Sequence, residues 1–171
     1  MDRRQSAFAS ENYAITRLRC RPIVTERQLQ EKFMGQRVPE GIFKRNGEIV
    51  TIEVKRIPGN ELPYETSKKR CIKLSDSNRK AAPRHIRWPW TSTVKTALSK
   101  LQPDIAANYN VCKHTAVFLI PTSLPAKAKK RTIQHITTVA DGFLSSHTSK
   151  SFKVEWCILE TPDEFFDRLC L

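Results

Sequence analysis

The sequence predicts an α/β sandwich in which a central mixed sheet, containing a β-hairpin, is flanked by helices. The dipeptide Asn46-Gly47 separates two apolar stretches, and both residues tolerate the positive φ angles that a two-residue type I′ turn requires. After residue 90, apolar residues recur at helical spacing, and apolar strands then alternate with helical segments. This order of elements is typical of a sheet whose strands are bridged by helices.

The size of the chain fits one domain. Its 171 residues can bury a core without disulfides or a structural metal. We expect a single domain over 1–171, with a basic N-terminal arm over 1–24 and a basic insertion over 58–90. The five cysteines show no CxxC spacing, which favours reduced thiols in an intracellular protein, cytoplasmic if bacterial.

The charge of the chain points to an anionic partner. Lysines and arginines number 30 against 17 acidic residues, giving a net charge of +13. Nucleic acid is the natural partner for such a field. A membrane surface or an acidic protein would also complement this positive charge. No apolar run approaches the roughly 20 residues of a spanning helix, however, so we expect no membrane partner.

Two helices are expected before the hairpin. The arm leads into a short helix near Glu11–Leu18. Thr25 then begins a capping box with Gln28, which predicts a helix over Glu26–Met34 that ends at Gly35.

The hairpin strands are expected at 41–45 and 48–57, and the second strand is apolar enough on both faces to be central. If Arg45 faces Glu48 across the turn, the same register places Glu40 opposite Glu53. Facing residues lie about 4.5–5.5 Å apart at Cβ, where like charges destabilise a sheet unless a positive group lies between them.

The second half alternates helices and strands. The helical stretch from Thr91 contains Pro103, which either kinks it or starts a second helix. The remaining expected elements are a strand at 115–120, a helix from Pro125 that buries Ile133, Ile136, Ala140 and Phe143, a strand at 152–159, and a helix capped at Thr161 that runs to Leu169.

Two groups of cations are candidates for contact with nucleic acid. The segment 58–90 is longer than the roughly 12–15 residues usual for a structureless loop, so it is either a substrate-facing insertion or a solvated mobile loop. Trp88 and Trp90 within it would either stack on bases or plug the core. The candidate contacts are Lys68, Lys69, Arg70, Arg79, Lys80, Arg84 and Arg87 there, with Lys127, Lys129, Lys130 and Arg131 at a later helix start.

The hairpin register brings metal-binding chemistry together. Glu40 and Glu53 suit Mg²⁺, which takes one or two protein carboxylates and keeps several waters, and the backbone carbonyl of Val54 could add a ligand. Lys55 projects from the same face as Glu53 and could orient or deprotonate an attacking water. Glu26 could reach the metal or its water shell from the preceding helix. By default, Glu-x-Lys is a solvated ion pair, and Glu26 a carboxylate favoured by the helix dipole.

These residues resemble the PD-(D/E)xK nuclease superfamily, with the restriction-endonuclease-like fold of restriction enzymes, Holliday-junction resolvases and transposon end-cleaving nucleases. Pro39-Glu40 resembles its first motif, Glu53-Val54-Lys55 its second, and Glu26 its helix acid. Glutamate at position 40 is a departure, because aspartate is commoner there. Members often carry a basic or amide residue on the helix that follows, where Lys95 and Lys100 lie; we leave both outside the catalytic set.

The resemblance implies an endonuclease dependent on Mg²⁺, or on Mn²⁺, that hydrolyses DNA. It would act as a homodimer or as a subunit of a recombination, transposition or restriction assembly. The alternative is a catalytically inactive module of the same fold that binds DNA or RNA within a larger nucleoprotein assembly. The four histidines show no pairing that suggests a general base or a ligand set.

Overall fold

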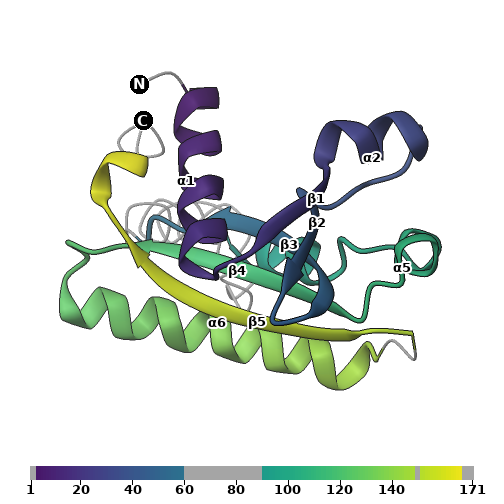
Figure 1. Cartoon of the computed structure of the whole chain (residues 1–171). Coiled ribbons are helices and arrows are strands. Elements are labelled where there is room, and N and C mark those ends of the chain that lie inside the picture. Colours follow the sequence, from purple (N-terminus) through teal and green to yellow (C-terminus); the bar gives the residue numbers. More distant parts are fainter. Residues whose placement is uncertain (1–2, 60–89, 149–150, 167–171) are drawn as a thin grey trace, which may run out of the picture.

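A five-stranded mixed sheet forms the centre of the computed structural model, which describes residues 3–59, 90–148 and 151–166 (Figure 1). The strands lie in the order β1-β2-β3-β4-β5. The first three are antiparallel neighbours and the last three are parallel neighbours. In chain order the elements are α1 (Arg3–Arg17), β1 (Arg21–Thr25), α2 (Glu26–Lys32), β2 (Gly41–Arg45), β3 (Glu48–Arg56), α4 (Thr91–Leu98), α5 (Pro103–Tyr109), β4 (Lys113–Pro121), α6 (Ala126–Ser146), β5 (Lys153–Thr161) and the 3-10 turn η1 (Asp163–Phe165).

The predicted hairpin is confirmed. Asn46 and Gly47 have φ angles of 50° and 83°, as a type I′ turn requires. The ladder pairs Arg45 with Glu48 and continues in the predicted register to Ile42 and Thr51. Strand β3 is the middle strand of the sheet, as its apolar character predicted.

The capping box that begins α2 is also confirmed. The Thr25 hydroxyl accepts from the Gln28 backbone N–H, and the Gln28 side chain accepts from the Thr25 backbone N–H. The helix ends at Lys32, two residues before the expected Met34.

The predicted start of the first helix is wrong. Helix α1 begins at Arg3, well before the predicted Glu11, and strand β1 follows it as an edge strand. The buried side of α1 carries Ser6, Ser10 and Ala14. Such small, partly polar residues let the helix approach the sheet closely but give little hydrophobic periodicity, so the sequence pattern did not reveal the whole helix.

Two predictions for the second half need correction. Ile133 is 37% exposed, while Ile136 and Ala140 are buried, because Ile133 lies at the edge of the apolar stripe of α6. The predicted final helix is replaced, within the described residues, by the short turn η1. Its expected cap, Thr161, is buried and paired with Pro121 at the end of β5. Pro103 starts the separate helix α5.

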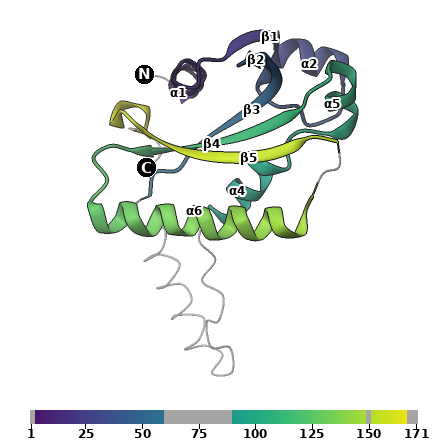
Figure 2. The same ribbon diagram turned by 60° about the horizontal axis from the view of Figure 1, so that its bottom comes forward.

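Helices cover both faces of the sheet (Figures 1 and 2). Helix α1 and η1 pack on the face formed by Val50, Ile52 and Val54. Helices α4 and α6 pack on the opposite face against β4 and β5. Because side chains alternate along β3, its polar residues Thr51 and Glu53 belong to the face covered by α4.

Seven candidate nucleic-acid contacts lie outside the described residues, as does Trp88: Lys68, Lys69, Arg70, Arg79, Lys80, Arg84 and Arg87. Trp90 is described. It is 7% exposed and belongs to the core with α4 and α6, so of its two predicted roles the structure supports the core plug. No helix among the described residues is long and apolar enough to cross a membrane.

Candidate active site

The site lies where the two hairpin strands separate. Strand β2 begins at Gly41, and its last ladder pair with β3 is Ile42 with Thr51. Just beyond, the Glu40 backbone N–H donates to the Ile52 carbonyl at 3.3 Å. This bond is one residue out of the hairpin register, so Glu40 follows β3 closely but does not continue the ladder as predicted.

The strand geometry turns the Val54 backbone toward this opening. The Ile52 carbonyl points to the β2 side of β3, and backbone groups two residues apart on a strand point to the same side. The N–H and C=O of Val54 therefore face the edge that β2 has left. A hydrogen bond between the Val54 backbone and the Glu40 carboxylate is consistent with this direction.

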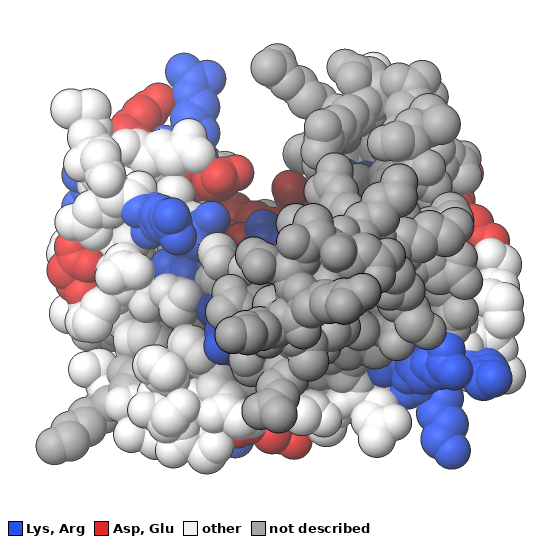
Figure 3. Space-filling view, turned by 180° about the vertical axis from the view of Figure 1, so that it is seen from behind, with Lys and Arg blue, Asp and Glu red and all other residues white. Residues whose placement is uncertain are grey.

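A cavity of ≈ 230 Å³ opens at this point between α1 and the end of β3. It combines acidic, basic and backbone groups from three parts of the chain. Its lining residues are Ala7, Ser10, Glu11, Glu40, Val54, Lys55 and Arg56. Seen from behind, the surface is hollowed near its centre, with acidic atoms inside the hollow (Figure 3).

Glu53 is the most buried acid of the group, with 1% of its surface exposed. Its Oε1 atom receives two ammonium groups: Lys55 Nζ at 2.6 Å and Lys100 Nζ at 3.5 Å. Its Oε2 atom is buried and has no hydrogen-bond partner among the described residues. The carboxylate thus has one neutralised oxygen and one that is unsatisfied, which is costly in a buried group.

The acidity of Glu40 is strongly perturbed. Burial, followed by the nearby carboxylates of Glu53 and Glu11, raises its pKa to about 9, although Lys55 and the Val54 backbone oppose the shift. Its Oε2 atom is likewise buried without a hydrogen-bond partner in the described part of the chain. Two neighbouring carboxylates that disfavour each other's charge are a common arrangement at functional sites.

The first helix supplies a third acid, Glu11. It lines the cavity, and its pKa is raised by burial and then by the nearby Glu26 carboxylate, with Lys55 opposing. The predicted helix acid, Glu26, is exposed and does not line this cavity; its carboxylate accepts a hydrogen bond from Gln30 at 2.9 Å. The helix acid that lines this cavity is therefore Glu11 of α1, and not the predicted Glu26.

The surroundings of Lys55 favour its charged ammonium form. Burial lowers its pKa, but the charge of Glu53 and their hydrogen bond, with Glu40 and Glu11 behind them, produce a net rise. The Lys55 side chain is about one third exposed, at 31%. It therefore reaches from the buried Glu53 to the open cavity.

The donors suit a hard divalent cation. Two buried, unsatisfied carboxylate oxygens belong to Glu40 and Glu53, and the Val54 carbonyl faces the same edge. Among the described residues, no three His, Cys, Asp or Glu side chains lie close enough to hold a metal ion. A cation here would therefore take two carboxylates and complete its shell with backbone, water or phosphate oxygens, as Mg²⁺ commonly does.

The basic cluster at the start of α6 lies apart from the cavity. Lys127, Lys130 and Arg131 are exposed. Lys129 Nζ is 3.0 Å from Glu160 Oε1. In the view from behind, a group of basic side chains projects at the molecular edge over this helix end, on the same side as the acidic hollow (Figure 3).

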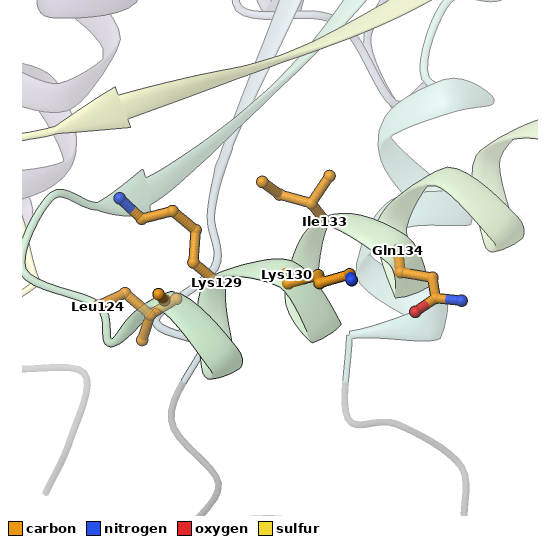
Figure 4. Close-up of a pocket in the computed structure, with 6 residues that line it drawn as sticks. Leu124, Lys129, Lys130, Ile133 and Gln134 are labelled. Atoms are coloured by element: carbon orange, nitrogen blue, oxygen red, sulfur yellow. The ribbon is translucent and has the colours of Figure 1, made fainter.

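A larger cavity, ≈ 710 Å³, lies along the same helix end. Leu124 and Ile133 line it together with Lys129, Lys130 and Gln134 (Figure 4). No acidic residue is among the described residues that line it. Its size is therefore no argument for catalysis, and the smaller cavity with the convergent charges remains the candidate site.

Comparison with known proteins gives no relative to guide the assignment. No protein-family model, curated protein or solved structure matches the chain. The function must therefore be argued from the site itself.

Sequence reasoning missed two members of the charged group. Glu11 lies beside the small residues Ser10 and Ala14 on α1, and that stripe of small residues was the available signal of a closely packed helix. Lys100 was noted but left outside the catalytic set, because only the tertiary fold brings it to Glu53.

Proposed function

We propose that this chain is a divalent-metal-dependent endonuclease that hydrolyses DNA phosphodiester bonds. The observation that carries the proposal is the pair of buried, unsatisfied oxygens, Glu40 Oε2 and Glu53 Oε2, beside the ammonium group of Lys55. A buried acid pair of this kind is costly unless a cation or a proton lies between its members. Glu40 and Lys55 line an open cavity, and Lys55 contacts Glu53, which favours a cation that substrate can reach.

Each residue has a defined role in this proposal. Glu40, Glu53 and the Val54 carbonyl would hold Mg²⁺, with Mn²⁺ as a substitute. When bound, the ion would lower the pKa of a coordinated water and stabilise charge on the phosphoryl oxygens. Lys55 would orient the attacking water and neutralise the phosphoryl group. Glu11 would hydrogen-bond water at the α1 side of the cavity.

The fold supports the resemblance to the PD-(D/E)xK superfamily. A hairpin carries Glu53, Glu40 directly precedes its first strand, parallel strands follow it, and helices cover both faces of the sheet. These features agree with a restriction-endonuclease-like architecture in an intracellular nuclease. A homodimer, or a subunit of a recombination, transposition or restriction assembly, would supply a second site for cutting the second strand.

The DNA backbone would lie across the side of the molecule that carries both the acidic hollow and the exposed cations of α6. Lys127, Lys130 and Arg131 are exposed there and would contact phosphate. Cations at the start of a helix oppose its dipole, so their presence favours an anionic partner over a role in helix stability.

The second candidate is an inactive nuclease-fold module that binds DNA or RNA. One observation favours it: the pKa of Glu40 near 9 allows a proton to take the place of the metal at neutral pH. On this view the acid pair is neutralised without an ion.

Nicking of supercoiled plasmid separates the two candidates. Wild-type protein with Mg²⁺ or Mn²⁺ is expected to convert supercoiled to nicked plasmid, whereas Glu53→Gln and Lys55→Met should each slow cleavage by about 10² to 10⁴. Lys44→Met, on the exposed part of β2, is the matched control and should cleave normally. Plasmid binding without cleavage by wild type, with either metal, would support the binding module instead.

A further inference from the structure

Two lysines compete for one oxygen of Glu53. Lys55 Nζ lies 2.6 Å and Lys100 Nζ 3.5 Å from the same Oε1 atom. Lys55 comes from the catalytic strand β3, whereas Lys100 follows the end of α4. The Lys100 side chain is 21% exposed, less than the 31% of Lys55, so it is the more enclosed of the two.

This double contact matters because the proposed reaction moves Lys55 away from Glu53. To meet a water or phosphate oxygen, Lys55 must leave the Glu53 carboxylate. A metal ion would meet the other oxygen, Oε2, but the buried Oε1 atom would lose its nearest hydrogen-bond donor, which is unfavourable. A second ammonium group already beside Oε1 removes that penalty.

A buried hydrogen-bonded chain holds the end of α4, next to Lys100. His114 is fully buried, and its Nε2 lies 2.8 Å from the Ala97 carbonyl in α4. Because a carbonyl can only accept, Nε2 carries the hydrogen, and Nδ1 accepts from the Thr51 hydroxyl at 2.8 Å. The same Ala97 carbonyl lies 3.5 Å from the Lys100 backbone N–H.

The chain connects Lys100 to the strand that carries Glu53. Thr51 and His114 are direct partners in the parallel ladder between β3 and β4. Thr51 also lies two residues before Glu53, on the same face of β3. The hydrogen bonds therefore tie the end of α4 to β3 at the level of the acid that Lys100 contacts.

We propose that Lys100 is a positioning residue that holds the Glu53 carboxylate when Lys55 turns to the substrate, and that His114 acts through it by anchoring the end of α4. The inference rests on the proposed nuclease function and adds a residue to it. It gives the two lysines different tasks: Lys55 contacts the reacting groups, and Lys100 contacts only Glu53.

The test separates metal binding from cleavage in Lys100→Met. Removing a positive charge beside Glu53 should tighten Mn²⁺ binding, measured by paramagnetic resonance of the free ion, because like charges repel. Plasmid nicking should nevertheless slow by about 10-fold or more, since Lys55 stays on Glu53. Lys100→Arg should restore nicking. Lys95→Met, at an exposed position of helix α4, should match wild type.

A double-mutant cycle tests the role of His114. His114→Leu should slow nicking in the wild-type background, after thermal unfolding has shown that the variant folds. In the Lys100→Met background it should add little, because the residue through which it acts is already absent. An equal further loss in both backgrounds would show a general packing defect and overturn the role of His114.

The outcomes distinguish this inference from the proposed function. Wild-type protein that neither binds Mn²⁺ nor nicks DNA would overturn the nuclease proposal, and the inference with it. Active wild type with an equally active Lys100→Met would overturn the inference alone. Weaker Mn²⁺ binding by Lys100→Met would do the same, since a positioning cation should oppose the metal and not recruit it.

Discussion

The carboxylates of Glu40 and Glu53 each keep one buried oxygen without a hydrogen-bond partner among the described residues, and the charge of Glu53 helps to raise the pKa of Glu40. Buried polar atoms are normally paired, so two exceptions on neighbouring acids require an explanation. A shared divalent cation would satisfy both oxygens and reverse the repulsion between them.

The first prediction is that Mg²⁺ stabilises the folded protein. A ligand that binds only the folded state adds about 2.7 kcal/mol at a concentration 100 times its Kd. For a chain of this size, that corresponds to a rise in Tm of about 5–10 °C. Differential scanning fluorimetry should show this rise for wild type and none for Glu53→Gln. An equal rise in both proteins would place the ion elsewhere.

The second prediction concerns pH in metal-free protein. Folding raises the pKa of Glu40 from 4.5 to about 9, so its favourable contribution is full below 4.5 and is lost as pH rises toward 9. The loss is at most about 1.4 kcal/mol per pH unit. Urea unfolding in a chelator should therefore show that Glu40→Gln gains stability over wild type as pH rises. Parallel pH profiles for the two proteins would contradict the pKa shift.

The third prediction compares the two helix acids. Glu11 lines the cavity, whereas Glu26 is exposed on α2. Glu11→Gln should slow plasmid nicking by about 10-fold or more, and Glu26→Gln should have a smaller effect because its charge is screened by solvent. Rates measured at saturating Mg²⁺ decide between them. A larger effect of Glu26→Gln would show that Glu26, and not Glu11, is the helix acid of the site.

The fourth prediction concerns the cations of α6. Each phosphate contact contributes about −0.9 to the slope of log K against log salt concentration. Removing both Lys127 and Lys130 should weaken DNA binding at low salt and reduce that slope by up to about 1.8. Lys153→Ala, an exposed position at the start of β5, is the control. DNA binding is measured by fluorescence anisotropy over a range of salt concentrations. A double variant that keeps the wild-type slope would show that these two lysines do not contact phosphate.

The hairpin could be predicted because its signals are local. The Asn46-Gly47 turn defines its own register, and that register places Glu53 and Lys55 on one face. The position of Glu40 was predicted less well: its hydrogen bond to Ile52 shifts by one residue, because the strands separate there and turn chemistry no longer controls the pairing.

The remaining members of the site could not be derived from local patterns. Glu11 reaches the cavity because Ser10 and Ala14 allow α1 to pack closely on the sheet, a contact without apolar periodicity. Lys100 reaches Glu53 through the packing of α4 on β3 and β4, which His114 stabilises by a hydrogen bond to Ala97. Both relationships join elements that are distant in sequence, so neither spacing nor propensity predicts them.

Glu40 and Glu53 are proposed to share a divalent cation. Crystals of the protein soaked with Mn²⁺ test it through an anomalous difference map recorded at the manganese edge. We expect one peak in contact with both Glu40 Oε2 and Glu53 Oε2, and its loss in Glu53→Gln crystals. A map without a peak between these oxygens, while Mn²⁺ is bound at another place, would contradict it.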